Sequence, residues 1–169
     1  MPACPAVRSA EAVDLPEVLA IYAQEVLHGT ASFEIEPPDL AELARRYERV
    51  RKLGLPWLVA EYHEGIAGFA YATTYRDRPA YRYTVEDSVY VAPGARGAGL
   101  GRTLLEGVIS RASMAGARQM VAGIGDSGRE LYTCLTHFAE DGQRRNPVPL
   151  GRPTKDVSKL LQKTYEVCS

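Results

Sequence analysis

The sequence predicts one domain of the α/β class, built on a mixed β-sheet, and three observations lead to that prediction. Runs rich in β-branched and aromatic residues recur at 57–61, 66–74 and 84–92, with short connections that favour antiparallel neighbours. The segment 84–124 has the order strand, helix, strand, and such a crossover makes its two strands parallel. The length of 169 residues suits a single domain over 1–169 with one sizeable core.

The first third of the chain predicts a short strand at 6–10 and two amphipathic helices. The first helix is expected to begin at Asp14, which can cap it, and to end at Gly29. The second is expected to open at Pro37-Pro38-Asp39, and its charged outer face is typical of a solvated surface, not of a nucleic-acid patch. The apolar positions at helical spacing are Leu15, Val18, Leu19, Tyr22 and Val26, then Leu40, Leu43, Ala44, Tyr47 and Val50.

The middle and end of the chain complete the predicted sheet. A hairpin turn is expected at His63-Glu64-Gly65 and a polar loop at 75–83. A third helix, with Leu104, Leu105, Val108, Ile109 and Ala112 on one face, precedes a strand at 119–124. The signal is weaker after Gly128, where a helix at 130–138, a loop at 141–153 and a final strand or short helix at 157–167 are expected.

A glycine-rich turn, 96–101, lies between the strand at 84–92 and the third helix. Three glycines in five residues remove the side chains that would keep an anion away from the backbone amides. The partial positive charge of the helix N-terminus adds to the attraction, and Arg96 and Arg102 bracket the turn with full charges. The turn therefore predicts a site for a phosphate or diphosphate, although an ordinary strand-to-helix turn has the same composition.

Two familiar phosphate motifs do not fit the turn. A Walker A loop requires a glycine where this chain has Arg96, and a lysine that is absent before Thr103. A dinucleotide fingerprint requires G-x-G-x-x-G, whereas Gly97, Gly99 and Gly101 are one residue too close. A nucleotide-binding protein that uses this turn in another way stays an open alternative.

The pattern Arg96-x-x-Gly99-x-Gly101, preceded by Glu86-Asp87-Ser88-Val89-Tyr90-Val91, resembles the coenzyme loop of GNAT-type N-acetyltransferases. The similarity is greatest to the branch that acetylates phosphinothricin and methionine sulfoximine, and it covers residues 6–128. The segments that carry it are Asp14-Leu15, Ile21-Tyr22, Thr30-Ala31-Ser32-Phe33, Leu58-Val59-Ala60, Gly68-Phe69-Ala70-Tyr71, 76–81, 84–101 and Gly125-Asp126-Ser127-Gly128. From 129 to 169 the chain diverges: Arg129 stands where the family has asparagine, and His137 lies about one position from the family histidine.

The resemblance implies a GNAT-like acyl-CoA N-acyltransferase fold that holds acetyl-CoA as co-substrate. Glu86 matches the family acid that removes the amine proton, directly or through water. The strand is expected to offer backbone groups to the pantetheine arm and to negative charge on the thioester oxygen. The coenzyme-binding residues are then Val89, Tyr90, Val91, Arg96, Gly97, Ala98, Gly99, Leu100, Gly101 and Arg102.

The resemblance also predicts an acceptor site. Arg76, Arg78 and Tyr81 match a substrate loop, where a guanidinium can take a carboxylate or phosphinate in a bidentate way. The alternative is a solvated basic loop with internal pairing to Asp77. Phe33 matches a residue that packs on the substrate, or it anchors the core.

Composition limits the other function classes. The net charge of −1 gives no reason to expect nucleic acid or an anionic membrane as partner, and no apolar run reaches the length of a membrane span. The N-terminus lacks the pattern of a secretion signal, and Cys4, Cys134 and Cys168 lack metal-ligand spacing. We therefore expect free thiols, no metal and a cytoplasmic protein. His28 and His63 are expected on the surface, and His137 is expected to be an ordinary polar residue.

The functional prediction is an acetyl-CoA-dependent N-acetyltransferase that acts on a small amino-acid-like amine by direct attack. No cysteine lies where a covalent intermediate would form, which agrees with direct attack. The resemblance further implies a homodimer. The alternative from another class is a coenzyme A-binding module with weak catalysis, because the last quarter departs from the family pattern.

Overall fold

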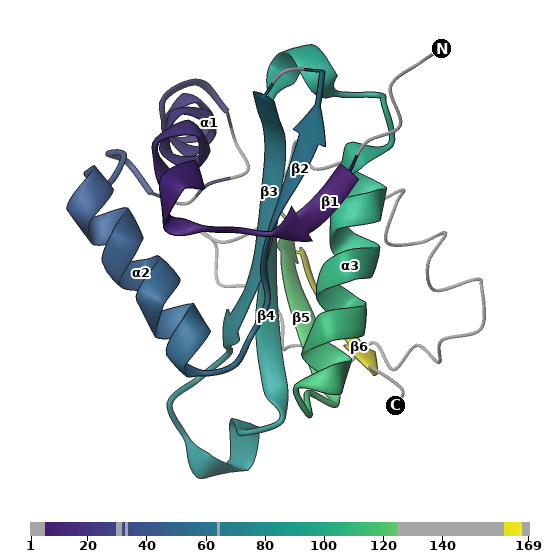
Figure 1. The fold of residues 1–169 in the computed structure, drawn as a ribbon. Coiled ribbons are helices and arrows are strands. Elements are labelled where there is room, and N and C mark those ends of the chain that lie inside the picture. Colours follow the sequence, from purple (N-terminus) through teal and green to yellow (C-terminus); the bar gives the residue numbers. More distant parts are fainter. Residues whose placement is uncertain (1–5, 30–31, 33, 64, 125–160, 167–169) are drawn as a thin grey trace.

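The computed structural model describes residues 6–29, 32, 34–63, 65–124 and 161–166. Within these residues one six-stranded sheet carries three α-helices (Figure 1). The elements are β1 (Ala6–Ser9), α1 (Leu15–His28), α2 (Leu40–Lys52), β2 (Trp57–Tyr62), β3 (Gly65–Thr74), β4 (Thr84–Val91), α3 (Leu100–Met114), β5 (Gln119–Ile124) and β6 (Leu161–Glu166), with 3-10 turns η1 (Ala12–Asp14), η2 (Pro79–Tyr81) and η3 (Pro93–Ala95).

The strands lie in the order β1-β2-β3-β4-β5-β6. All neighbours pair antiparallel except β4 and β5, which are parallel because α3 carries the chain back to the other end of the sheet. The mixed sheet predicted from the sequence is therefore confirmed. The alternative of a final strand is the one observed, since β6 pairs with β5.

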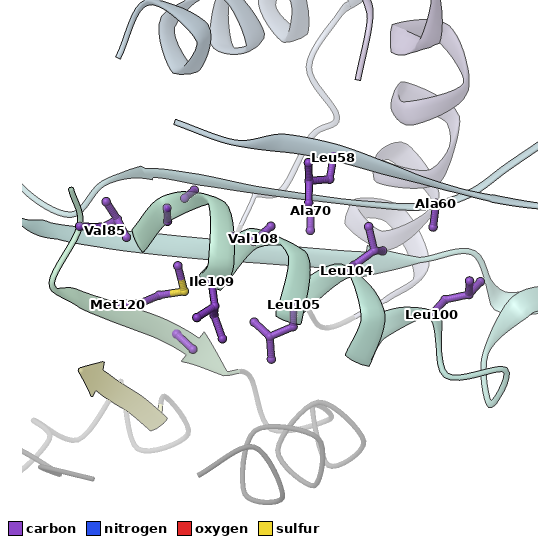
Figure 2. Close-up of a cluster of buried hydrophobic side chains, with 14 of the residues drawn as sticks. Leu58, Ala60, Ala70, Val85, Leu100, Leu104, Leu105, Val108, Ile109 and Met120 are labelled. Atoms are coloured by element: carbon purple, nitrogen blue, oxygen red, sulfur yellow. The ribbon is translucent and has the colours of Figure 1, made fainter. Parts of the chain in front are cut away.

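The helices cover both faces of the sheet, as Figure 1 shows: α1 and α2 lie on one face and α3 on the other. Two buried clusters follow from this layering. On one face, α3 packs against small strand residues, including Ala60 and Ala70 (Figure 2). On the other face, α1 and α2 pack against aromatic strand residues, including Trp57 and Phe69.

The two helices of the first third begin in different ways. At α2 the prediction is confirmed, because an Asp39 oxygen accepts a hydrogen bond of 2.7 Å from the Glu42 amide. At α1, Asp14 stands at the cap position but makes no capping bond. Its carboxylate instead accepts two hydrogen bonds from Arg8, of 2.7 and 2.8 Å, and one from the Glu11 amide. An ion pair with β1 thus outcompetes the local cap.

The strand β4 pairs with β3 along most of its length but with β5 only over its first half. Toward β3 the ladder runs from Thr74↔Val85 to Gly68↔Val91. Toward β5 the ladder covers only Thr84 to Asp87. On its other edge, β5 pairs with β6. Among the described residues, the β5-facing edge of 88–91 therefore takes no part in the strand ladder.

Candidate active site

Glu86 lies on β4, two residues in from the start of the strand. Its neighbours along the strand, Val85 and Asp87, face α3, so the alternation of a strand turns Glu86 toward the α1 and α2 side. The side chain is half-buried, and desolvation by burial raises the pKa of its carboxyl above the usual range. Among the described residues no ion pair involves Glu86, which leaves this carboxylate a stronger base than one on the surface.

Hydroxyl groups share this face with Glu86. Ser88 and Tyr90 follow at every second position of β4, and Tyr71 stands opposite Ser88 on β3. The Tyr22 and Tyr90 rings meet edge to face with centroids 5.1 Å apart. Burial raises the pKa of both the Tyr71 and the Tyr90 phenols, so these groups stay protonated hydrogen-bond donors near neutral pH.

Tyr90 was predicted from the sequence as a coenzyme-binding residue, but no hydroxyl group was predicted to lie on the same face as Glu86, although one signal could have found Ser88 and Tyr90 there. Ser88 and Tyr90 have the same strand parity as Glu86, and period-two alternation puts them on its face. The contributions of Tyr22 and Tyr71 could not be found in this way, because they depend on how α1 and β3 meet β4.

The glycine turn connects β4 to α3 by way of η3. Gly97 and Gly99 have φ of +80° and +81°, which side chains other than glycine rarely adopt. A Cβ built on either residue meets no atom within 4 Å, so the backbone of the turn is open on that side. Gly99 forms the N-cap of α3, and no side chain caps the helix there. The positive end of the α3 dipole is therefore available to an anion.

The two arginines that bracket the turn have different partners. Arg102, at the third position of α3, donates from Nε to a Glu106 oxygen at 2.8 Å. Arg96 forms an ion pair with Glu25 of α1, although 71 residues separate the two in the chain. Neither the sequence pattern nor the family resemblance gave Arg96 this partner.

The remaining residues predicted for the coenzyme differ in exposure. Val89 and Val91 are partly buried and pack against the α3 cluster, so they also serve the core. Tyr90 packs on the opposite face, and Leu100 is buried under the turn. Ala98 is exposed, and Gly101 would place a Cβ 3.7 Å from Val91. Together with the turn, these residues form a continuous strand–turn–helix segment.

The predicted acceptor residues lie on the loop between β3 and β4, at the opposite end of the sheet from the glycine turn (Figure 1). The Arg76 guanidinium lies 5.1 Å from the Tyr75 ring and 6.0 Å from the Tyr81 ring. Arg78 is exposed, and within the described residues no ion pair joins Asp77 to either arginine. Both guanidiniums thus keep charge available to an anionic group, and the pairing with Asp77 that belonged to the alternative of a solvated loop is not observed.

Several predicted residues lie outside the described part of the chain: Phe33, His137, the helix expected at 130–138 and all three cysteines. His28 and His63 are exposed, as expected. Within the described residues, no three His, Cys, Asp or Glu side chains are grouped so that they could hold a metal ion. None of the helices in that part of the chain has the length and apolar character needed to cross a bilayer.

Comparison with known proteins adds to this geometry. The family model described as acetyltransferase (GNAT) matches residues 17–134. A phosphinothricin N-acetyltransferase of Alcaligenes faecalis is 55% identical over 115 residues, which are 68% of this chain and 58% of that protein. An L-methionine sulfoximine/L-methionine sulfone acetyltransferase of Salmonella typhimurium is 39% identical over 118 residues, covering 70% of this chain and 69% of the relative. The matched part of the chain thus spans less than two thirds of the length of the Alcaligenes protein.

Solved structures resemble the whole arrangement. A GNAT superfamily phosphinothricin acetyltransferase of Sinorhizobium meliloti, in complex with acetyl-CoA, matches with a TM-score of 0.80 and 34% identity, covering 95% of this chain and 86% of that one. A Salmonella typhimurium protein determined with its cofactor acetyl-CoA matches with a TM-score of 0.84 and 30% identity, covering 97% and 94%.

Proposed function

We propose that this chain, which belongs to the GNAT family of acetyltransferases, transfers the acetyl group of acetyl-CoA to the amino group of a small amino-acid-like substrate. The observation that carries the proposal is the half-buried Glu86, a carboxylate with raised pKa on the strand that leads into the open glycine turn. The proposed acceptors are of the phosphinothricin or methionine sulfoximine type, which the names of the relatives support.

Glu86 acts in this proposal as the general base. An ammonium group cannot attack a carbonyl carbon until it loses a proton, and a carboxylate with raised pKa accepts that proton more readily. The proton moves to a Glu86 oxygen, directly or through one water, and the neutral amine then attacks without a covalent enzyme intermediate. Tyr71 and Tyr90 stay neutral beside this position and offer hydroxyl groups to the acceptor.

The strand–turn–helix segment is the proposed coenzyme site. Acetyl-CoA, when bound, supplies the activated thioester carbon. The amides of 97–101 and the N-terminus of α3 suit its diphosphate, because two positive-φ glycines keep that side of the turn open. Within the described part of the chain, the edge of 88–91 that faces away from β3 takes no part in a strand ladder, and it suits an extended arm with amide groups, since peptide-like hydrogen bonds can form along it. The strand itself spans about 17 Å from Glu86 to Val91, and this length separates the proposed diphosphate site from the reacting end of the coenzyme.

Arg76, Arg78 and Tyr81 form the proposed acceptor site, together with Phe33. The two guanidiniums suit the anionic groups that every amino-acid substrate carries. The stacking of Arg76 on two tyrosine rings supports this role, because it orients the guanidinium before a ligand arrives. We further propose a single catalytic domain over 1–169, a homodimer and a cytoplasmic location. Light scattering after size-exclusion chromatography would measure the oligomeric state.

One experiment tests the proposal directly. Release of free thiol from acetyl-CoA is measured with methionine sulfoximine, phosphinothricin, a panel of proteinogenic amino acids and a panel of polyamines. We expect turnover with the first two substrates and little with polyamines, which carry no anion for Arg76 and Arg78. Calorimetry with coenzyme A, ATP and NAD gives the binding readout, with coenzyme A the tightest ligand.

Two outcomes would contradict the proposal. Coenzyme A binding without turnover on any amine would favour a coenzyme A-binding module. Tighter binding of ATP or NAD than of coenzyme A would favour a nucleotide-binding protein.

A further inference from the structure

Arg96, the first residue of the glycine turn, connects three parts of the molecule. Its Nη2 donates to Oε1 of Glu25 on α1. Its Nε lies 3.5 Å from the carbonyl oxygen of Val91, at the end of β4. A single side chain thus links α1, the end of the strand and the start of the turn.

Glu25 lies nearly buried close to the end of α1. Its side chain is only 9% exposed, whereas that of Arg96 is 46% exposed. A Cβ on Gly29, the residue that ends α1, would lie 1.8 Å from Oε2 of Glu25. The Glu25 carboxylate thus occupies the space in which a side chain at residue 29 would begin. A carboxylate so far removed from water requires a cationic partner, and Arg96 provides one.

The pair affects the turn by ordering the Arg96 side chain. A guanidinium carries five donors in a rigid fork, so those directed at Glu25 fix the orientation of the others. A side chain that is ordered before the ligand arrives loses less entropy on binding.

We propose that Glu25 is a positioning residue for the coenzyme and that it acts through Arg96. The ion pair anchors the first residue of the glycine turn to α1 and so maintains the turn conformation in which Gly97 and Gly99 leave the amides open. This inference rests on the proposed function, because it assumes that the turn holds the diphosphate of acetyl-CoA. The competing explanation is an ion pair that only stabilises the fold.

The test compares the wild-type protein with E25Q, which removes the charge and keeps the shape. We expect the Kd for coenzyme A, measured by calorimetry, and the KM for acetyl-CoA to rise about tenfold. We expect kcat at saturating coenzyme to change by less than about twofold, because Glu25 does not contact the reacting atoms. E48Q is the matched control: it breaks the exposed Glu48–Arg51 pair on α2 by the same substitution and leaves both constants unchanged.

A double variant separates positioning from stability. If Glu25 acts through Arg96, the Kd of E25Q/R96Q equals that of R96Q alone, because the second substitution has nothing left to disturb. The inference would be overturned if E25Q bound coenzyme A as tightly as the wild-type protein or more tightly, or if the two substitutions had additive effects on Kd. A lower melting temperature of E25Q would not rescue it, because that would show only a role in stability. If E25Q does not fold, E25D retains the charge but shortens the reach, and it must also raise the Kd.

Failure of the inference can be told apart from failure of the proposed function. A wild-type protein that does not bind coenzyme A contradicts the function itself. A wild-type protein that binds coenzyme A, together with an E25Q variant that binds it equally well, contradicts only the role of Glu25.

Discussion

The two faces of the sheet are built from different kinds of residue. On the α3 face the strands contribute mainly alanines, and leucines of the helix fill the space above them (Figure 2). On the α1 and α2 face the strands contribute aromatic rings, with Trp57 and Tyr71 stacked at 4.4 Å and Phe69 and Tyr90 at 5.0 Å. Small strand residues thus let α3 pack closely on the sheet, which positions the N-terminus of the helix. On the other face, the tyrosines place hydroxyl groups on the side of the sheet that carries Glu86.

Substitutions on the two faces should therefore affect different properties of the protein. Changes on the α3 side should affect stability or coenzyme binding. A change at Glu86, on the other side, should affect the chemical step and leave coenzyme binding intact. Four variants test this division, from the largest expected effect to the smallest.

E86Q should reduce kcat by roughly 10²–10⁴-fold, because an amide cannot accept the proton of the substrate ammonium. The Kd for coenzyme A should not change. In the wild-type protein kcat/KM should rise with pH as Glu86 ionises, with a midpoint above the ordinary range of a glutamate because burial raises its pKa. Steady-state kinetics between about pH 5 and 8, where most proteins are most stable, would check the kcat of E86Q and the pH dependence of the wild-type protein. A kcat near the wild-type value would exclude Glu86 as the base.

L104A should lower the free energy of unfolding by about 2–5 kcal/mol, because Leu104 is fully buried between α3 and the sheet. Chemical denaturation followed by circular dichroism would measure the loss. M114A, on the same helix but at a residue that is 85% exposed, is the control and should change stability by less than about 0.5 kcal/mol. Equal effects of the two substitutions would contradict the packing of α3 described above.

G99V should raise the Kd for coenzyme A at least about tenfold, because a branched side chain would cover the open amides and disturb the positive-φ backbone. G54V is matched for strain, since Gly54 has φ of +69° and also has no atom within 4 Å of a built Cβ. Both variants should lose similar stability, and only G99V should lose affinity in calorimetry. Unchanged affinity in G99V would argue against the turn as the diphosphate site.

D87N should flatten the dependence of stability on pH. Asp87 faces α3, one of its oxygens has no hydrogen-bond partner, and burial raises its pKa to about 7. Because the folded state holds this proton more tightly than the unfolded chain, wild-type stability should fall as pH rises from about 4 to about 7. We expect a loss on the order of 1–3 kcal/mol over that range, largely absent in D87N, by denaturant unfolding at several pH values. An equal slope in both proteins would assign the dependence to other groups.

Much of the fold could be predicted from local patterns. The β-branched and aromatic residues along 84–92 and the helical spacing from Leu104 to Ala112 indicated β4 and α3, and the strand–helix–strand crossover predicted the parallel pair of β4 and β5. Gly29 at the end of α1 and Asp39 at the start of α2 were confirmed as helix boundaries. The capping hydrogen bond expected from Asp14 is not formed, because its carboxylate makes an ion pair with Arg8 of β1 instead.

The candidate site divides in the same way. The sequence by itself determined the strand, the glycine turn and the helix, since period and glycine content are properties of the local chain. Only the tertiary structure decided that Arg96 pairs with Glu25, that the β4–β5 ladder ends at Asp87, and that the half-buried Glu86 shares its face of the sheet with partly buried phenols. The physical reason is that burial and charge pairing depend on which distant segments of the chain come into contact. Those contacts are determined by how the whole sheet packs between its helices.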